Sequence, residues 1–209
     1  MTGLQAGKMV LWSMFTISPC AAGCGRPAIS GSNICFIHQA DQEQETNRIL
    51  AAISGNDTIK NLNVSGMHFS CVDFSNRRYY GCNFQNVNFS KCLFSGNLFR
   101  MCFFDFAEFS GCDFLKSDLQ FLSFAGTHIT NCTFGSSEVV HVNFLGSTIS
   151  HTSFSNLNLY NSRFINADMK FVKFIDCNVK RVHFSGSRQE NIVFKSSNTA
   201  EALFETEDQ

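Results

Sequence analysis

Residues 82–114 read CNFQNVNFSKCLFSGNLFRMCFFDFAEFSGCDF, and phenylalanine occurs at every fifth position of this stretch. The same phase extends in both directions, from Ile59 to Phe204, and comprises thirty positions at which we expect a large apolar side chain. Eighteen of the thirty are Phe, although the whole chain of 209 residues has only 24. A period of five fits neither a helix nor a strand, so the pattern predicts an internal repeat of the solenoid type.

Two other positions of the five-residue unit have a composition of their own. The residue two before each central position is small or modestly apolar, as at Cys82, Val87 and Ala107. The residue two after it is Gly or Asn at fifteen of the thirty positions, for example Gly96 and Asn131. Because Gly and Asn best tolerate a positive φ, each unit is predicted to contain a turn and two inward side chains.

The central positions also alternate with a ten-residue period. One sub-series stays nearly all Phe as far as Phe204, whereas the other changes after Phe109 to Leu119, Ile129 and later residues that are mostly aliphatic. Two opposite sides of a square coil would produce this alternation. We therefore expect four units, or about 20 residues, in each coil, and about 7.5 coils with a total length of about 36 Å at the usual strand spacing.

Units such as 112–114 (CDF), 142–144 (VNF) and 167–169 (ADM) resemble the repeat of the pentapeptide-repeat family. The resemblance extends over about 150 of the 209 residues. It implies an all-β fold, a right-handed quadrilateral parallel β-helix, which we assign to residues 57–206. It says little about function, because a fold does not specify a site.

The segment 1–55 lies outside the repeat and contains a possible set of metal ligands. Cys20, Cys24, Cys35 and His38 follow the pattern C-x3-C-x10-C-x2-H, in which two close pairs can surround one tetrahedral ion. The pattern resembles small zinc-knuckle or treble-clef modules. It predicts a structural Zn²⁺ site within residues 20–38, with unliganded thiols as the alternative. Four protein ligands would leave no open position for catalysis.

Residues 41–54 are predicted to form a helix that covers the amino-terminal end of the β-helix together with the zinc module. Asp41 can cap this helix, Gln44 occupies the capping-box position, and Gly55 can end it. Before the module, the apolar run 9–17 (MVLWSMFTI) is too short to span a bilayer. We expect it to pack on the first coil or on the module, with a targeting segment as the alternative. Residues 207–209 are predicted to be an acidic tail.

Cysteine placement favours reduced thiols over a disulfide framework. Six of the ten cysteines occupy the inward small-residue position, where a free thiol behaves as a small hydrophobe. They are Cys82, Cys92, Cys102, Cys112, Cys132 and Cys177. We therefore expect a cytoplasmic protein, with a secreted bacterial effector as the alternative.

The charge balance and the polar residues favour no catalytic or nucleic-acid function. The formal net charge is -1, so neither nucleic acid nor a membrane surface is an expected partner. Asp105, Asp113 and Asp118 fall in different parts of the coil, and the histidines do not cluster. We expect no enzyme activity, because a convex prism lacks the cleft in which acid and base groups converge.

Positions 20 apart should form outward columns, and one edge of the coil gathers aromatic and arginine residues. The residues of this edge are Tyr80, Arg100, Met101, Phe103, Phe121, Tyr160 and Arg181. Exposed aromatics beside arginines are typical of protein interfaces, so the sequence predicts a noncatalytic interaction module with an unknown protein partner. A homodimer is an open alternative. The family resemblance also suggests a DNA mimic that binds a topoisomerase such as gyrase, as quinolone-resistance members do, although basic residues interrupt its negative charge.

Overall fold

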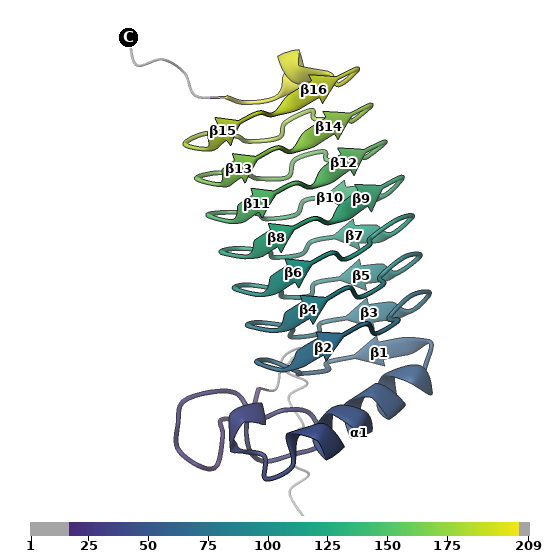
Figure 1. Ribbon diagram of the computed structural model, residues 1–209, viewed down its shortest axis with the longest axis vertical. Coiled ribbons are helices and arrows are strands. Elements are labelled where there is room, and N and C mark those ends of the chain that lie inside the picture. The colour runs from purple at the N-terminus through teal and green to yellow at the C-terminus, as the bar shows by residue number, and fades with distance from the viewer. Residues whose placement is uncertain (1–16, 205–209) are drawn as a thin grey trace, which may run out of the picture.

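The computed structural model describes residues 17–204, which form a column of stacked coils above a small amino-terminal cap (Figure 1). The column is a right-handed all-β solenoid of about seven turns. Every strand pairs in parallel with the equivalent strand of a neighbouring coil, as Phe89 does with Phe109. Phe89 and Phe109 are separated by four of the predicted units, so the predicted coil length is confirmed.

Three sides of the coil are sheets of three-residue strands. The first sheet contains β1 (Thr58–Lys60), β3 (Arg78–Tyr80), β5 (Leu98–Arg100), β7 (Asp118–Gln120) and β10 (Glu138–Val140). The second contains β2 (His68–Ser70), β4 (Asn88–Ser90), β6 (Glu108–Ser110), β8 (His128–Thr130), β11 (Thr148–Ser150), β13 (Asp168–Lys170) and β15 (Arg188–Glu190). The third contains β9 (Thr133–Gly135), β12 (Ser153–Ser155), β14 (Lys173–Ile175) and β16 (Val193–Lys195).

The fourth side has isolated parallel bridges instead of longer strands, and we call it the bridge face. Its bridging residues are Asn63, Asn83, Phe103, Ser123, Asn143, Arg163, His183 and Leu203. The corner at which the chain leaves the first sheet for the bridge face is the first corner. The first corner comprises Asn61, Gly81, Met101, Phe121, His141, Asn161 and Arg181.

Stacked phenylalanine rings fill the interior of the rod. Phe144, for example, lies parallel to Phe124 and Phe164, with ring centroids 5.2 and 4.6 Å away, and meets Phe154 edge to face. Such offset and edge-to-face pairs add to the stabilisation that comes from burial alone. The apolar centre of each unit is therefore the core of the fold, as the period of five predicts.

The turn is more regular than the sequence suggests. All twenty-eight positions in steps of five from 61 to 196 have a positive φ, between 49° and 75°, although only fifteen of them are Gly or Asn. Bulky residues such as Met101 and Phe121 adopt the same conformation, with φ of 54° and 56°. Their backbone is held by the coil beyond, as when the Phe121 amide donates to the carbonyl of Val140 at 3.3 Å. Hydrogen bonding between coils therefore imposes the turn on residues that would not favour it alone.

The repeat weakens at the carboxyl end, where the expectation of a large apolar side chain was wrong at two central positions, 189 and 199. Gln189 occupies a central position but is exposed within β15, and Thr199 begins the short 3-10 helix η2 (Thr199–Glu201) instead of another strand. A polar side chain at these centres cannot add to the apolar core. The last, partial coil nevertheless continues the stack, because Leu203 bridges to His183 and the Phe204 ring lies 5.1 Å from that of Phe184. The predicted tail 207–209 and most of the run 9–17 lie outside the described residues.

The amino-terminal cap continues the core of the rod. Helix α1 (Gln42–Ser54) begins after Asp41, whose side chain accepts a hydrogen bond from the Gln44 amide at 2.9 Å, as predicted. Ile49 and Ile53 from this helix, with Phe36 from the 3-10 helix η1 (Phe36–His38), belong to the same buried cluster as the first coil. These side chains cover an end of the rod that would otherwise expose apolar surface to water.

Polar contacts also join the cap to the first coils. The Asn63 side-chain amide donates to the Ala28 carbonyl at 2.6 Å, and the Ser30 amide donates to the Asn63 carbonyl at 2.9 Å. Arg77, at an inward position, donates from Nε to the carbonyl of Ile53 near the end of α1 at 3.1 Å. Within residues 17–204 no helix is long and apolar enough to cross a membrane.

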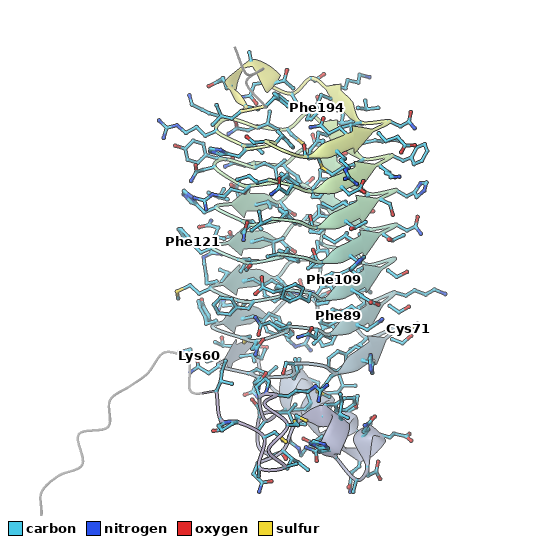
Figure 2. The ribbon with its side chains drawn as sticks, turned by 90° about the vertical axis from the view of Figure 1, so that its left-hand side faces the viewer. Lys60, Cys71, Phe89, Phe109, Phe121 and Phe194 are labelled. Atoms are coloured by element: carbon cyan, nitrogen blue, oxygen red, sulfur yellow. The ribbon has the colours of Figure 1, made fainter. Side chains whose placement is uncertain are left out.

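The cysteines differ sharply in exposure, which leads to a test of the fold. The six inward cysteines are buried, and burial raises the pKa of Cys102 and of Cys177. Among all ten, which lie within the described residues, only Cys71 is exposed, at a turn on the opposite edge of the rod from Phe121 (Figure 2). Because the thiolate is the reactive form, burial should protect the core thiols from alkylation.

We therefore expect one fast-reacting thiol when the reduced, zinc-loaded protein is titrated with a disulfide reagent, and six thiols that react only after denaturation. The rates are measured by absorbance and the modified residues by mass spectrometry. Cys71→Ser should remove the fast phase. Rapid modification of several core cysteines in the folded protein would contradict the structure.

Candidate metal centre and interaction face

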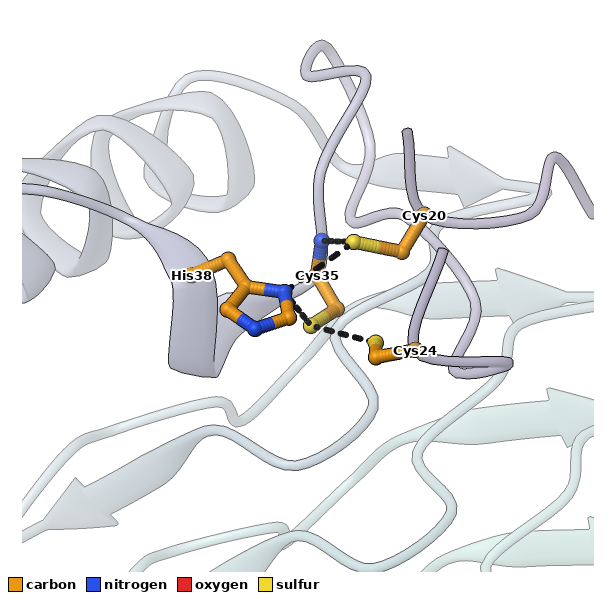
Figure 3. Close-up of side chains that lie close together, drawn as sticks. All are labelled: Cys20, Cys24, Cys35 and His38. Carbon is orange, nitrogen blue, oxygen red and sulfur yellow. Dashed lines mark hydrogen bonds between the residues drawn. The ribbon is translucent and has the colours of Figure 1, made fainter. Parts of the chain in front are cut away.

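Four potential metal ligands converge in the cap (Figure 3). Cys20 and Cys24 come from the first loop, whereas Cys35 directly precedes η1 and His38 is its last residue. The four ligand atoms all lie within 4.8 Å of one another. The Sγ atoms of Cys24 and Cys35 are 3.6 Å apart, and His38 Nδ1 lies 3.3 Å from Cys20 Sγ. A tetrahedron with the usual Zn–S and Zn–N distances has edges of about 3.5–3.8 Å. These two separations are close to such edges, so the four side chains could hold a metal ion.

Local backbone structure explains how the first pair is presented. Gly23 and Gly25 on either side of Cys24 have φ of 73° and 76°, so the chain turns sharply around this ligand. Pro19 and Pro27 form an antiparallel bridge, and the Cys20 amide donates to the Arg26 carbonyl at 2.8 Å, which closes the loop.

The electrostatics of the site favour thiolates at two of the three cysteines. The backbone amide of Cys35 donates to Cys20 Sγ at 3.3 Å and lowers the pKa of Cys20. A hydrogen bond from the backbone of Arg26 lowers the pKa of Cys24 in the same way. Burial raises the pKa of Cys35. Amide donors aimed at sulfur are the interactions that stabilise a coordinated thiolate and orient it.

The residues predicted to bind a partner lie along the first corner and its two flanks. Met101 and Phe121 are 40% and 55% exposed at the corner itself. Tyr80, Arg100 and Tyr160 are half-buried on the first-sheet side, Phe103 is half-buried on the bridge face, and Arg181 is exposed at the top of the corner. The structure thus gathers the seven residues on one edge of the rod.

These residues do not all have the same freedom. Arg100 forms an ion pair with Asp118 and donates to the carbonyls of Phe99 and Asp118, so its guanidinium is fixed to the first sheet. Arg181 lies over the Tyr160 ring, with Cζ 6.0 Å from the centroid, and donates to the Tyr160 hydroxyl at 3.1 Å. Arg181 thus keeps its guanidinium at the surface, where it can also meet a partner.

The structure adds residues that the sequence argument missed. His141 stacks on Phe121 with centroids 5.1 Å apart and meets the Tyr160 ring edge to face at 6.0 Å. Phe106, at the next corner, is 63% exposed and would clash with a side chain at Gly126 in the coil above. Phe106, like Met101, lies two residues after a central position, and this signal was present in the sequence. Only the structure shows that the bridge face lies between the two corners and connects them.

We call this surface the interaction face. It consists of three sets of residues, each taken in steps of 20. The first set is the last residue of each first-sheet strand and the equivalent residue in later coils (60, 80 and onward to 180), and the second is the first corner. The third set is the outward residues of the bridge face (63, 83 and onward to 183, and 65, 85 and onward to 185). The large apolar members of the interaction face are Met101, Phe103, Phe121, Val140, Leu145 and Ile165. Its Arg163 and Asn143, together with His141 and Asn161, line a shallow pocket of about 150 Å³.

Comparison with known proteins agrees with the repeat. Residues 80–114 and 143–181 match the family described as pentapeptide repeats, in eight copies. These two segments therefore resemble pentapeptide repeats, as the sequence suggested. No curated protein matches the chain significantly.

Solved structures with some similarity include HetL, a pentapeptide-repeat protein involved in heterocyst differentiation regulation from the cyanobacterium Nostoc sp. strain PCC 7120. It is 13% identical, with 77% of this chain and 96% of HetL covered and a TM-score of 0.31. Rfr23 from the cyanobacterium Cyanothece 51142 is 10% identical, with coverage of 78% and 99% and a TM-score of 0.38. The plasmid-mediated fluoroquinolone resistance protein QnrB1 is 17% identical, with coverage of 68% and 81% and a TM-score of 0.30.

Proposed function

We propose that this chain is a noncatalytic scaffold that binds a protein partner through the interaction face, and that a structural Zn²⁺ ion holds its amino-terminal cap together. The observation that supports it best is the presence of large side chains at corner positions where the core does not need them. Met101 and Phe121 combine exposure with a strained φ, a combination that serves no packing purpose inside the rod. A protein interface supplies the missing purpose.

The zinc part of the proposal is supported by the match between the ligand separations and a tetrahedral site. All four protein ligands would be used, so the ion would have no position for substrate. Buried reduced thiols fit a cytoplasmic location, which belongs to the same proposal.

A mimic of duplex DNA is less well supported. Such a surface needs columns of carboxylates, but the interaction face has Arg100, Arg163 and Arg181 and only Asp105 as an acidic residue between positions 60 and 185. The side chain of Asp105 already accepts hydrogen bonds from Gln85 at 3.0 Å and from the Ser123 hydroxyl. A gyrase supercoiling assay tests this alternative directly, and we expect no inhibition.

The scaffold proposal is tested with the double variant Met101→Asn and Phe121→Asn. Asn tolerates a positive φ better than Met or Phe, so we expect the free energy of unfolding to stay the same or rise by up to about 1 kcal/mol. Capture of partner proteins from cell extract, quantified by mass spectrometry, should fall. Phe171→Asn is the matched control, since Phe171 is exposed at a turn with φ of 55° on another corner. A clearly less stable double variant with unchanged capture would place the partner on another face.

A further inference from the structure

We propose that the interaction face binds an extended acidic segment of a partner protein, with one hydrophobic side chain over Phe121 and carboxylates at Arg163 and Arg181. The inference rests on the proposed function and specifies the chemistry of the partner. It follows from the distribution of charge around the rod, from the availability of two arginines, and from the spacing of the coils.

Charge is distributed unevenly around the rod, although the whole chain is nearly neutral. Between positions 60 and 185 the interaction face carries five Lys or Arg residues and a single acidic residue, Asp105. The basic residues are Lys60, Arg100, Arg163, Lys180 and Arg181. The Asp105 carboxylate is further occupied by the Ala125 amide, which donates to it at 3.2 Å. A face of this sign favours an acidic partner and disfavours a basic one.

Three of the five basic residues, Lys60 in the first coil and the two arginines Arg163 and Arg181, form no ion pair within residues 17–204. Arg100 pairs with Asp118, and Lys180 pairs with Glu201 at 2.9 Å, so a ligand would have to compete for both. Arg163 and Arg181 are exposed, and neither forms an ion pair with any residue between 17 and 204. A guanidinium without a carboxylate partner can bind an incoming carboxylate through two parallel hydrogen bonds.

The apolar and the basic parts of the face are joined by the pocket at His141, Asn143, Asn161 and Arg163. The Nδ2 atom of Asn161 lies 2.7 Å from His141 Nδ1, and His141 in turn stacks on Phe121. A continuous path therefore leads along the rod axis from an aromatic surface to two arginines. No carboxylate lines this pocket.

The coil spacing sets the length of the ligand. Arg163 and Arg181 lie two and three coils beyond Phe121, which corresponds to about 10 and 14 Å along the axis at about 4.8 Å per coil. An extended peptide covers about 3.3 Å per residue, so three or four residues span these distances. The expected ligand therefore has a large apolar residue and Asp or Glu three and four positions away.

An acidic peptide fits this face better than a nucleic acid does. Proteins that hold nucleic acid through its backbone commonly make about 6–10 phosphate contacts. Here two unpaired arginines stand on a largely apolar and amide-rich surface. A nucleic acid is nevertheless the other polyanion that the test must include.

The experiment measures fluorescence anisotropy of labelled peptides with the full chain loaded with zinc. The probe is a twelve-residue peptide with one Trp and with Glu at the third and fourth positions after it. A second peptide has Gln in place of both Glu, and a labelled ten-nucleotide oligothymidine represents nucleic acid. The test variant is Arg163→Glu with Arg181→Glu, and Arg163→Gln with Arg181→Gln guards against misfolding. The control is Lys173→Glu with Lys195→Glu, which makes the same charge change in the same coils on the third sheet.

We expect the Glu peptide to bind the wild-type protein at least about tenfold more tightly than it binds either arginine variant. For the wild-type protein, we expect the Glu peptide to bind about tenfold more tightly than the Gln peptide. The lysine control should bind like wild type. No binding of the Glu peptide at about 1 mM, or tighter binding of the oligothymidine, would overturn the inference. Another outcome is that the Glu and Gln peptides bind equally well and that the double variant Met101→Asn and Phe121→Asn binds neither. That result would overturn the acidic partner but would leave the interaction face in place.

Discussion

Replacing Phe144 by Ala is expected to lower the free energy of unfolding by about 3–5 kcal/mol. The Phe144 ring is fully buried, and it separates Phe124 from Phe164 in a stack whose centroids are 5.2 and 4.6 Å from its own. Both neighbours are held by backbone hydrogen bonds to adjacent coils, so neither can move inward to fill the cavity. The cost of the substitution is therefore the sum of two terms, the lost free energy of transferring the ring out of water and the lost contacts around the cavity.

The measurement is equilibrium denaturation followed by circular dichroism, which should also show mainly β structure. Phe171→Ala is the matched control, because the Phe171 ring is exposed and stacks only at the surface, on His151. Apart from the loss of that stacking, the change should lower the free energy of unfolding by less than about 0.5 kcal/mol. An unchanged denaturation midpoint for Phe144→Ala would contradict the stacked core.

Changing Cys24 to Ser is expected to abolish binding of about one equivalent of Zn²⁺ by the purified protein. The three remaining ligands cannot close the tetrahedron, and the folding of a small metal module depends on metal binding, which contributes about 10–16 kcal/mol in zinc-finger peptides. Metal content is measured by elemental analysis of protein prepared reduced and without chelator. Cys71→Ser should keep its metal, since Cys71 is not one of the four clustered ligands.

Loss of metal should loosen the cap without unwinding the central coils. Hydrogen exchange should show lost protection in residues 18–55 and at the Asn63 amide, which donates to Ser30 Oγ at 2.8 Å. The amides around Phe144 should stay protected, because their partners lie in adjacent coils. Metal-free wild-type protein would refute the zinc site, and equal loss of protection throughout would show that cap and rod unfold together.

The sequence by itself determined the repeat, the coil length and the candidate ligands. Each of these depends on a local rule: an inward position must be apolar, a tight ligand pair needs close spacing, and Asp41 caps the helix that it precedes. Since a solenoid repeats one local unit, the period of the side chains is also the period of the structure. Phe84, Phe104 and Phe124 could therefore be stacked correctly from their numbers alone.

Only the tertiary structure decided which surface residues meet and which are already occupied. Arg100 and Arg181 looked equivalent in the sequence, but Asp118 neutralises the first, whereas Arg181 lies over the Tyr160 ring, donates to its hydroxyl and forms no ion pair within residues 17–204. The left-handed turn at Phe121 was likewise set by neighbouring coils. The physical reason is that exposed side chains and strained turns depend on contacts between successive coils, which are distant in the sequence, whereas the apolar core needs only its period.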